Sequence, residues 1–565
     1  MSGRRPAFPG LPGELVLEEA AGARQRCGSD GSVPGTLLCT NRRVAFVPAQ
    51  GPGSPRPFLP SEHEVALPCI RKLVAASSFT KPKVLTGAST LKFIPEELAL
   101  FCRDFRLLRF HFHENGLAPQ AFRVANAIAQ AREEAAWLGD AGEGCDGARP
   151  GDDEGEDEED EESEDGSSAT LLFESLRDWE KELKRQGAAG WRVSAVNERF
   201  DMAPSASAGT TRAAAPCSEP PPSTRGRSRA ARTRGAAAEE KWLSALEGTR
   251  WLDHVRSCLR KAVEVASLLA GRRCTVLLQE PSDRDLNCLL ASLVQLLGDP
   301  HSRTLPGFQS LLQREWVAAG HPFPHRLGLL RCDSPWEEAP VFLLFLDCTW
   351  QLVRQFPAAF GFTEAYLLAL HDSSFTPYFS TFLFSCQRQR GHGSLHRPRS
   401  QSYHPVSGGR EPGSTVLPEV WEWGLRYSRQ QRERFRNPAG AALGTPGTAE
   451  PQPNPASPWP GAGPGPVFLL TKGALSAQPL PWRGGRPPPH RSRWAPSLES
   501  LGEPGGGRPP LGLLLPCAAG PSVRLWARCY LRGLPEAQRG RFAPSPAGLA
   551  EELLLLQDRL SALTA

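Results

Sequence analysis

The sequence predicts a multidomain protein. A β-rich N-terminal domain closed by one helix precedes a partial α/β domain, and long disordered linkers separate the ordered blocks. Three observations lead to this prediction. Short runs of strand-forming residues precede one amphipathic stretch in the first 138 residues. A buried strand, a polar turn and an apolar helix follow one another at residues 275–297. The 54 glycines and 55 prolines of this 565-residue chain are clustered, as they are in connectors.

Residues 1–138 carry the pattern of the first domain. Residues 35–46 hold two β-rich runs around an Asn-Arg turn, which predicts a hairpin. Residues 101–112 alternate apolar and basic side chains in their second half, as a half-buried strand does. Residues 118–138 repeat apolar side chains at helical spacing, so we expect a closing amphipathic helix.

Charged segments follow this domain. Residues 139–170 include an acidic run at 152–165, which repels itself and predicts disorder, either as a solubilising linker or as a site for a basic partner. Residues 171–204 begin with a charged helix at 171–186. Residues 205–238 are rich in Ala, Pro, Ser and Arg and contain no interleaved aromatic residues. This favours a disordered linker over a nuclear-localisation or nucleic-acid segment, and we expect no nucleic-acid partner.

The strand, turn and helix at residues 275–297 have the geometry that cradles phosphate, because loop N–H groups and a helix N-terminus face an anion there. A cysteine-dependent phosphatase also needs a thiolate nucleophile and an arginine six residues after it. It needs a glycine where the backbone approaches the phosphate. Residues 280–286 are Glu-Pro-Ser-Asp-Arg-Asp-Leu, which lack the cysteine, the glycine and an arginine at that spacing.

The surrounding segments resemble the myotubularin family of phosphoinositide 3-phosphatases, whose loop sequence is His-Cys-Ser-Asp-Gly-Trp-Asp-Arg. The resemblance is carried by residues 242–252 before the loop and, after it, by residues 307–316, 320–323, 340–350 and 355–357. In this register the family's proton-donating aspartate is matched by Asp285. The nucleophilic cysteine, the loop glycine and the phosphate-binding arginine correspond to Glu280, Asp283 and Leu286.

These replacements oppose catalysis on physical grounds as well. Glu280 and Asp283 would place carboxylates where a phosphate belongs, and like charges ~4 Å apart repel by roughly 4 kcal/mol at an effective dielectric near 20. A carboxylate nucleophile would also lack the arginine and any evident Mg²⁺ site. The resemblance is therefore to the inactive branch of the family, and we predict no catalysis, no cofactor and no metal.

The resemblance implies a PH-GRAM domain for residues 1–138 and a cysteine-phosphatase-like α/β domain for residues 171–204 and 239–427. The family has sheet-forming sequence where this chain has residues 205–238. Part of the sheet is therefore expected to be missing, which exposes strand edges and lowers stability. Basic residues of the first domain could contact lipid headgroups or lie on ordinary solvated strand faces; they are Arg42, Arg43, Arg103, Arg106 and Arg109.

The 14 cysteines form no Cys-x-x-Cys pair, which indicates neither a zinc site nor a disulfide framework and favours a cytosolic protein with reduced thiols. Cys348 precedes Arg354 by six residues, but it belongs to an apolar, helical stretch without glycine, so we expect it in the core. The N-terminus lacks the apolar segment of a secretory signal, and no apolar run is long enough to span a membrane. We therefore expect a soluble or peripheral protein.

The C-terminal part begins with residues 428–515, which we expect to be a Pro/Gly-rich disordered segment. Within it, residues 437–510 are dominated by Pro, Gly and Ala and should be mostly disordered, with 467–470 as a strand that docks back. Residues 516–565 end in leucines at 4-3-4-3 spacing, an a/d seam just over two heptads long: Leu549, Leu553, Leu556, Leu560 and Leu563. Two heptads are marginal alone. Because family members dimerise through C-terminal coiled coils, the resemblance implies partner binding at this seam; packing on its own chain is the alternative.

The sequence thus predicts a pseudophosphatase that acts by binding. The resemblance implies a hetero-oligomer with an active phosphatase of the family, whose location, stability or activity the chain alters. It also implies that the protein is located in the cytoplasm, at the periphery of endosomal membranes in one possible case. Two alternatives remain open: a phosphoinositide-binding module that acts through residues 1–138, and a nonfunctional truncated isoform.

Overall fold

The computed structural model describes two folded domains and several segments docked on them. The described residues are 14–27, 31–49, 63–88, 91–112, 119–135, 137–138, 170–173, 176–186, 193, 248–272, 275–278, 285–331, 338–376, 379–383, 419–438, 467–471, 474–478 and 512–532. None of their helices is long and apolar enough to cross a membrane. The acidic run 152–165, the basic segment 205–238 and the leucine seam 549–563 lie outside the described residues.

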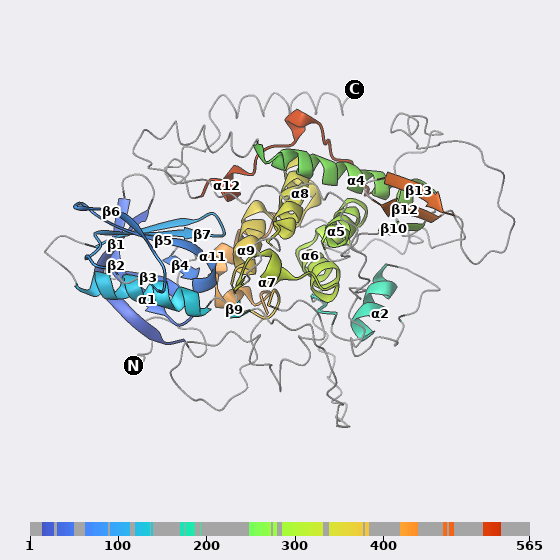
Figure 1. Ribbon diagram of the computed structural model, residues 1–565. Coiled ribbons are helices and arrows are strands. Elements are labelled where there is room, and N and C mark those ends of the chain that lie inside the picture. The colour runs from blue at the N-terminus through green and yellow to red at the C-terminus, as the bar shows by residue number, and fades with distance from the viewer. Residues whose placement is uncertain are drawn as a thin grey trace, which may run out of the picture.

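A β-rich domain forms one end of the molecule (Figure 1). Eight antiparallel strands make one sheet in the order β4-β3-β2-β1-β8-β7-β5-β6. Their bounds are β1 Val16–Cys27, β2 Gly31–Thr40, β3 Arg43–Pro48, β4 Glu64–Ala66, β5 Ile70–Ser77, β6 Thr80–Leu85, β7 Glu97–Cys102 and β8 Leu107–His111. The hairpin expected at residues 35–46 is confirmed as β2 and β3, and the strand expected in the second half of residues 101–112 is β8.

Helix α1, Pro119–Ala135, packs on this sheet through an apolar face that includes the fully buried Val124, Ala125 and Ile128. The predicted closing helix is therefore confirmed, although it ends three residues before residue 138. The reason is a change of partner, because Trp137–Leu138 forms strand β9, which pairs in parallel with β11, Leu330–Arg331. This pair joins the end of the first domain to the second.

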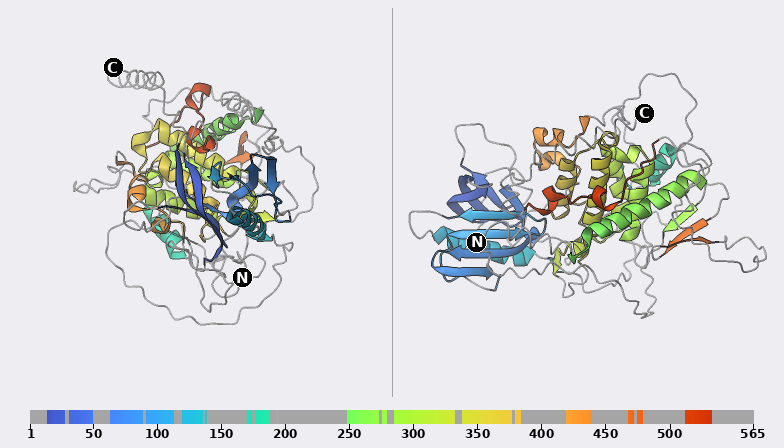
Figure 2. Two further views of the ribbon diagram at one scale, coloured as in Figure 1. Left: turned by 90° about the vertical axis from the view of Figure 1, so that its left-hand side faces the viewer. Right: turned by 90° about the horizontal axis from the view of Figure 1, so that it is seen from above.

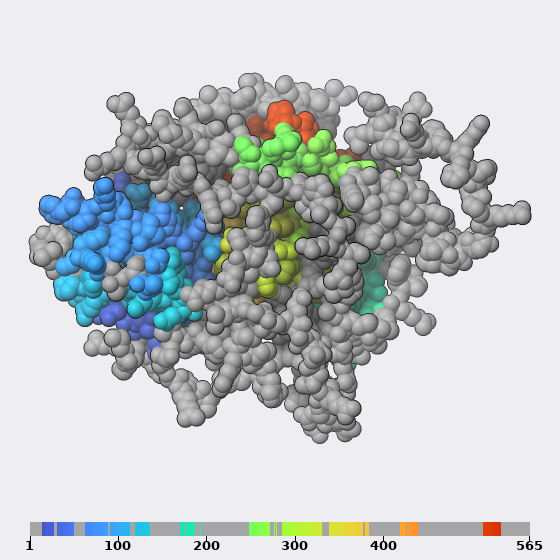
Figure 3. Space-filling model, in the orientation of Figure 1, coloured from blue at the N-terminus to red at the C-terminus, as the bar shows by residue number. Residues whose placement is uncertain are grey.

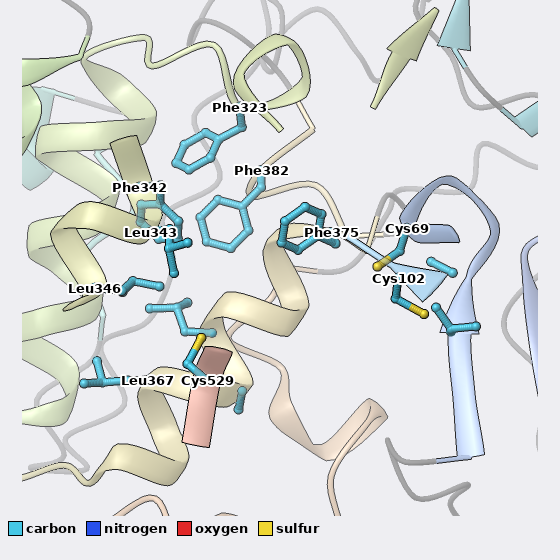
Figure 4. Close-up of a cluster of buried hydrophobic side chains, with 14 of the residues drawn as sticks. Cys69, Cys102, Phe323, Phe342, Leu343, Leu346, Leu367, Phe375, Phe382 and Cys529 are labelled. Atoms are coloured by element: carbon cyan, nitrogen blue, oxygen red, sulfur yellow. The ribbon is translucent and has the colours of Figure 1, made fainter. Parts of the chain in front are cut away.

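The second domain is mainly helical. Helix α5 lies against both α4 and α8, and α8 also packs on α9. The main bounds are α4 Trp251–Arg272, α5 Leu286–Gly298, α6 Leu305–Leu312, η5 Gln313–Ala318, α7 Phe323–Arg326, α8 Val341–Gln355 and α9 Glu364–Ser374. Shorter elements are η4 His301–Arg303, η7 Pro357–Ala359 and η9 Trp423–Leu425. Aromatic rings fill the interior, and Figure 4 shows Phe323, Phe342 and Phe382 gathered there.

A small sheet lies at the end of this domain that is remote from the β-rich domain (Figures 1 and 2). Strand β10, Thr275–Leu278, pairs in parallel with β12, Val467–Thr471, which pairs antiparallel with β13, Ala474–Gln478. The expectation that residues 467–470 dock back as a strand is confirmed. Among the described residues, this sheet has three strands, and the other strand of the second domain, β11, pairs with β9.

The expectation of disorder from residue 428 is wrong for two parts of 428–515. Helix α11, Arg429–Glu433, continues the folded domain: Phe435 is 5% exposed, and the Asn437 amide donates to the carbonyls of Pro357 and Phe360 at 2.8 and 2.9 Å. Residues 512–515 also pack on the helices, where the Leu514 N–H donates to the Leu297 carbonyl at 2.9 Å. The side chains of Phe435 and Asn437 and the backbone of Leu514 thus hold these two segments on the folded domain, through partners far away in the sequence.

The entry segment before the second domain docks through charge. Helix α2, Leu176–Arg185, confirms the charged helix expected at 171–186. Its Glu182 is 4% exposed and accepts hydrogen bonds at 2.6 Å from both Arg185 and Arg314. The Arg314 guanidinium also lies 5.4 Å from the ring centre of Phe173, just before the helix. A buried carboxylate between two guanidiniums therefore holds α2 on the helical domain.

Candidate functional site

The candidate site is the loop between β10 and α5. Strand β10 ends at Leu278 and α5 begins at Leu286, and the Asn287 amide donates to the Leu278 carbonyl at 3.4 Å across the gap. The strand and helix predicted around the loop are confirmed. Glu280 and Asp283 lie outside the described residues, so the structure places only Asp285 and Leu286 of the four predicted loop positions.

Asp285 is the N-cap residue of α5, but its carboxylate points to another part of the domain. Arg326 in α7 donates to both carboxylate oxygens, from Nε at 3.1 and 3.2 Å and from Nη2 at 3.0 Å. Nδ1 of the buried His321 lies 3.2 Å from Oδ1. Burial acts to raise the pKa of Asp285, yet the hydrogen bonds from His321 and Arg326 outweigh it and leave the pKa below its usual range.

This environment does not suit a proton donor. A general acid must hold its proton near neutral pH, which calls for a raised pKa, whereas Asp285 is kept as a carboxylate by its partners. The side chain instead connects the start of α5 to α7. His321 lies in a segment that already carried the family resemblance, but its contact with Asp285, and that of Arg326, follow from the fold alone because 36 and 41 residues separate them in sequence.

Leu286 opens α5 and is 45% exposed. Its side chain has no hydrogen-bond donor, so it cannot bind the oxygens of a phosphate as a guanidinium would. The guanidinium that contacts the described part of the loop is that of Arg326 in α7, and it is paired with Asp285. The described half of the site therefore offers a phosphate neither an anchor nor an acid.

Other candidate groups lie elsewhere. Cys348 is fully buried in α8, where burial raises the pKa of its thiol well above the usual range, so its predicted place in the core is confirmed. The described residues contain no group of three or more His, Cys, Asp or Glu side chains that could hold a metal ion.

The five arginines considered for lipid contact are engaged within the protein. Arg42 is 7% exposed and Arg43 is 6% exposed. Ion pairs engage four of the five side chains: Arg43 with Glu14 at 2.8 Å, Arg103 with Glu338 at 3.4 Å, Arg106 with Asp104 at 2.7 Å and Arg109 with Glu97 at 3.9 Å. Solvated strand faces are a wrong description of Arg42 and Arg43, because both are buried. Arg103 pairs with a carboxylate of the second domain, Arg106 with one in its own turn, and Arg109 with one on the neighbouring strand. Lipid contact through these residues stays a prediction.

Several of these side chains form the joint between the two domains. Glu64 in β4 is 1% exposed and pairs with Arg43 of its own domain and with Arg426 of the second domain, the latter at 3.1 Å. Arg426 also donates to the hydroxyl groups of Ser373 and Thr376 at 3.3 and 3.0 Å. One buried carboxylate thus binds a guanidinium from each domain.

The turn between β7 and β8 makes the second contact of the joint. Phe105 has a positive φ of 68°, an uncommon backbone conformation for a bulky residue. Its ring stacks on His371 with centres 6.0 Å apart and meets the edge of Tyr530 at 5.5 Å. Figure 4 shows Cys69 and Cys102 of the β-rich domain beside Phe375 of the helical one, and one continuous apolar core spans both domains.

Residues 512–532 close this joint from outside. Trp526, just before helix α12 (Ala527–Tyr530), is fully buried and stacks on Trp350 with centres 5.9 Å apart. The Tyr530 hydroxyl donates to the buried Asp347 at 2.6 Å, and Arg532 donates to Asp372 at 2.6 Å. We call residues 512–532 the clasp.

Comparisons with known proteins agree with this architecture. A family model described as myotubularin-like phosphatase domain matches residues 226–391, and one described as myotubularin-associated protein matches residues 507–565. Myotubularin-related protein 11 of Homo sapiens is 40% identical over 652 aligned positions, which cover 97% of this chain and 88% of the relative. The chain belongs to the myotubularin family.

Further relatives in this family differ in how much they share with the chain. Myotubularin-related protein 10-B of Xenopus laevis is 32% identical over 97% of this chain and 85% of its own length. Myotubularin-related protein 12 of Pongo abelii is 44% identical over 198 residues, which cover 35% of this chain and 25% of the relative.

The alignment with the human relative also measures what this myotubularin lacks. Since 97% of 565 residues is about 548, about 100 of the 652 aligned positions face no residue of this chain. This chain is therefore shorter than the relative within the aligned span; loss of sheet-forming sequence at residues 205–238 stays a prediction. The three-stranded sheet around β10 is consistent with that loss.

Proposed function

We propose that this myotubularin is a pseudophosphatase, which binds and regulates an active phosphoinositide 3-phosphatase of its family. The observation that carries the proposal is the state of the described loop. Leu286 occupies the position of the family's phosphate-binding arginine. Asp285 is a carboxylate whose charge is paired with that of Arg326. Glu280 replaces the cysteine that acts as the nucleophile in the family, so the chain lacks the side chain that would attack phosphorus.

The proposed partner is supported by the C-terminal match. The family model that covers residues 507–565 is described as myotubularin-associated protein, and the clasp occupies the first part of that range. The leucine seam (Leu549, Leu553, Leu556, Leu560 and Leu563) follows in the sequence and supplies the apolar stripe that a longer helix of a partner would cover.

We further propose that the β-rich domain is a PH-GRAM domain and that the protein acts in the cytoplasm, at the periphery of endosomal membranes. The eight-stranded sheet packed on one C-terminal helix supports the domain assignment. The buried joint speaks against a nonfunctional truncated isoform, because the two domains and the clasp form one continuous core despite the missing sequence. Phosphoinositide binding through Arg42, Arg43, Arg103, Arg106 and Arg109 is not favoured, since their ion pairs and burial engage them internally.

Affinity capture of the full chain from cells, followed by mass spectrometry, tests the partner. We expect an active myotubularin to be recovered, and we expect Leu553→Asp with Leu560→Asp to reduce that recovery. The matched control is Gln557→Asp with Arg559→Asp, which adds carboxylates off the predicted seam. Equal recovery with both double variants would move the interface away from the leucines.

Phosphate release tests the absence of catalysis separately. The purified chain should release no more phosphate from phosphatidylinositol 3-phosphate or the 3,5-bisphosphate than a buffer blank, because losing a nucleophile and its clamp costs several orders of magnitude in rate. Turnover that disappears in Glu280→Ala would contradict the proposal.

A further inference from the structure

An apolar, cationic surface lies at one edge of the β-rich domain, apart from the loop and the joint. Five large hydrophobic side chains are exposed among the described residues, and three of them belong to this edge. Phe79, between β5 and β6, is 93% exposed; Val84 in β6 is 47% exposed and Phe101 in β7 is 38% exposed. Figure 3 shows the β-rich domain, in blue, uncovered on this side of the molecule.

The turn that carries Phe79 is held in shape by Glu96. The last strand pair is Ser77 with Thr80, so Phe79 lies in the turn beyond the paired strands. The Glu96 carboxylate accepts hydrogen bonds from the Ser77 hydroxyl at 3.2 Å and from the Ser78 N–H at 2.9 Å, and a third from the Ser78 hydroxyl. An ordered turn therefore presents the ring to solvent, at little further entropic cost on binding.

Positive charge is spread along the β5–β6 hairpin that carries this turn. Between Glu64 and Glu96 the sequence contains no acidic residue and five cationic ones: Arg71, Lys72, Lys81, Lys83 and Lys92. Lys81 and Lys83 lie on β6, and the Lys72 ammonium lies 5.7 Å from the ring centre of Phe101. Of the nearby carboxylates, Glu97 pairs with Arg109 at 3.9 Å, whereas Glu96 accepts from neutral groups of the turn and keeps one negative charge beside the two lysines of β6.

Protection of the sheet edge does not account for all of these features. Strand β6 is an edge strand, and its lysines and Pro82 discourage pairing with another sheet. An exposed phenylalanine beyond the strand works against that purpose, because it adds apolar surface that invites association. The combination of one protruding aromatic ring and a surrounding of lysines fits a surface that is both apolar and anionic.

We propose that the tip, defined as Phe79, Lys81, Lys83 and Val84, inserts into the interfacial region of an anionic lipid bilayer. The ring enters the boundary between headgroups and acyl chains, while the ammonium groups meet the negative surface. The five arginines suggested by sequence patterning have no part in this contact. The inference is independent of partner binding by the C-terminal leucines.

Sedimentation of the full chain with vesicles tests the tip. Vesicles of phosphatidylcholine alone and of phosphatidylcholine with phosphatidylserine are compared at equal lipid concentration. We expect binding to the anionic vesicles only. Phe79→Ala should weaken it about tenfold, since burial of a phenylalanine is worth at least one factor of ten. Lys81→Gln with Lys83→Gln should weaken it about 30-fold in the same assay.

Matched variants elsewhere control for non-specific effects. Leu515→Ala removes another exposed apolar side chain, 49% exposed, and Arg429→Gln with Arg434→Gln removes two exposed cations; neither should change vesicle binding. Equal binding to neutral vesicles, or no loss in the tip variants, would overturn the proposal. Release by soluble inositol phosphates would assign the contact to a headgroup pocket instead. No vesicle binding, with capture of a protein lost in Phe79→Ala, would assign the tip to a protein partner.

Discussion

The joint between the domains and the loop before α5 both contain acidic side chains paired with arginines, but with opposite consequences. At the joint, Glu64 binds Arg43 and Arg426, and the pairing brings two domains together. At the loop, Asp285 binds Arg326, and the pairing removes from the pocket the one side chain that the resemblance assigned to catalysis. The Glu64 pairs thus connect two domains, whereas the Asp285 pair connects two helices of one domain, α5 and α7.

The electrostatics of the two regions support this contrast. Burial acts to raise the pKa of Glu64, and the attraction of Arg43 and Arg426 lowers it below the usual range, so the carboxylate stays charged. At the clasp, Asp347 has no cation among its hydrogen-bond partners; burial raises its pKa, although Tyr530, Trp251 and Gln351 donate to it. The charged pairs of Glu64 thus connect the two domains, the neutral donors to Asp347 connect the clasp to the helical domain, and the Asp285 pair connects α5 to α7.

The largest effect is expected from Glu64→Ala. It removes the carboxylate that pairs with the buried guanidinium of Arg426 and one of the two that pair with Arg43, which keeps Glu14; the expected cost is about 3–5 kcal/mol of the free energy of unfolding. Urea unfolding of the full chain measures it. The control is Glu433→Ala, whose exposed ion pair with Arg429 should be worth less than about 1 kcal/mol. Similar losses in the two variants would show that the joint contributes no more than a surface pair.

Glu182→Gln tests whether α2 is held by the same kind of buried pair. Burial raises the pKa of Glu182, but hydrogen bonds from Arg185 and the charge of Arg314 lower it to about 2. A lowered folded-state pKa stabilises the protein above the unfolded value and loses that effect as pH falls toward 2. We expect the variant to be less stable by about 2 kcal/mol at pH 7, and the difference to shrink between about pH 4.5 and 2. Parallel stability curves across this range would contradict the assignment.

Asp285→Asn separates a structural role from a catalytic one. Losing the charge weakens the bonds from Arg326 and His321, and because Arg326 is partly exposed the expected cost is about 1–2 kcal/mol. Phosphate release should stay at the blank level before and after the change. A loss of measurable turnover without any loss of stability would return Asp285 to the role of proton donor.

Local sequence patterns predicted the helices and strands, but the ion pairs between distant segments could not be predicted from them. The hairpin of β2 and β3, helix α1 and strand β12 all follow from the spacing of apolar residues over a few positions. The pair Glu64–Arg426 joins residues 362 apart, and no spacing rule connects them. The same limit explains Arg43, which a strand pattern places at the surface, but which is buried because Glu14 and Glu64 meet it there.

The site was predictable to a similar degree. The apolar run predicted the helix that begins at Leu286, and α5 confirms it, while the register of Asp285 and Leu286 on the family's loop stays a prediction. What the resemblance could not supply was the new partner of the aspartate, because Arg326 comes from a helix that reaches the loop only through the packing of the aromatic core. The expected disordered segment also included residues 429–438 and 512–515, although the Pro/Gly/Ala-rich composition covers residues 437–510. The order of those two segments depends on contacts with residues far away in the sequence, such as Pro357 and Leu297.

The smallest effect on stability is expected from Leu286→Arg, which restores the family's arginine. Because Leu286 is 45% exposed at the start of a helix, the change should alter the free energy of unfolding by no more than about 0.5 kcal/mol. Leu289→Arg is the matched control in the same helix: Leu289 is fully buried, and a guanidinium there should cost several kcal/mol. Urea unfolding of the two variants measures the difference. Phosphate release should remain at the blank level for Leu286→Arg, because Glu280 is no substitute for a thiolate and Asp285 stays paired with Arg326. Turnover restored by this single change would mean that the pocket had kept its chemistry and lacked only an anchor, and the contrast between joint and loop would fail.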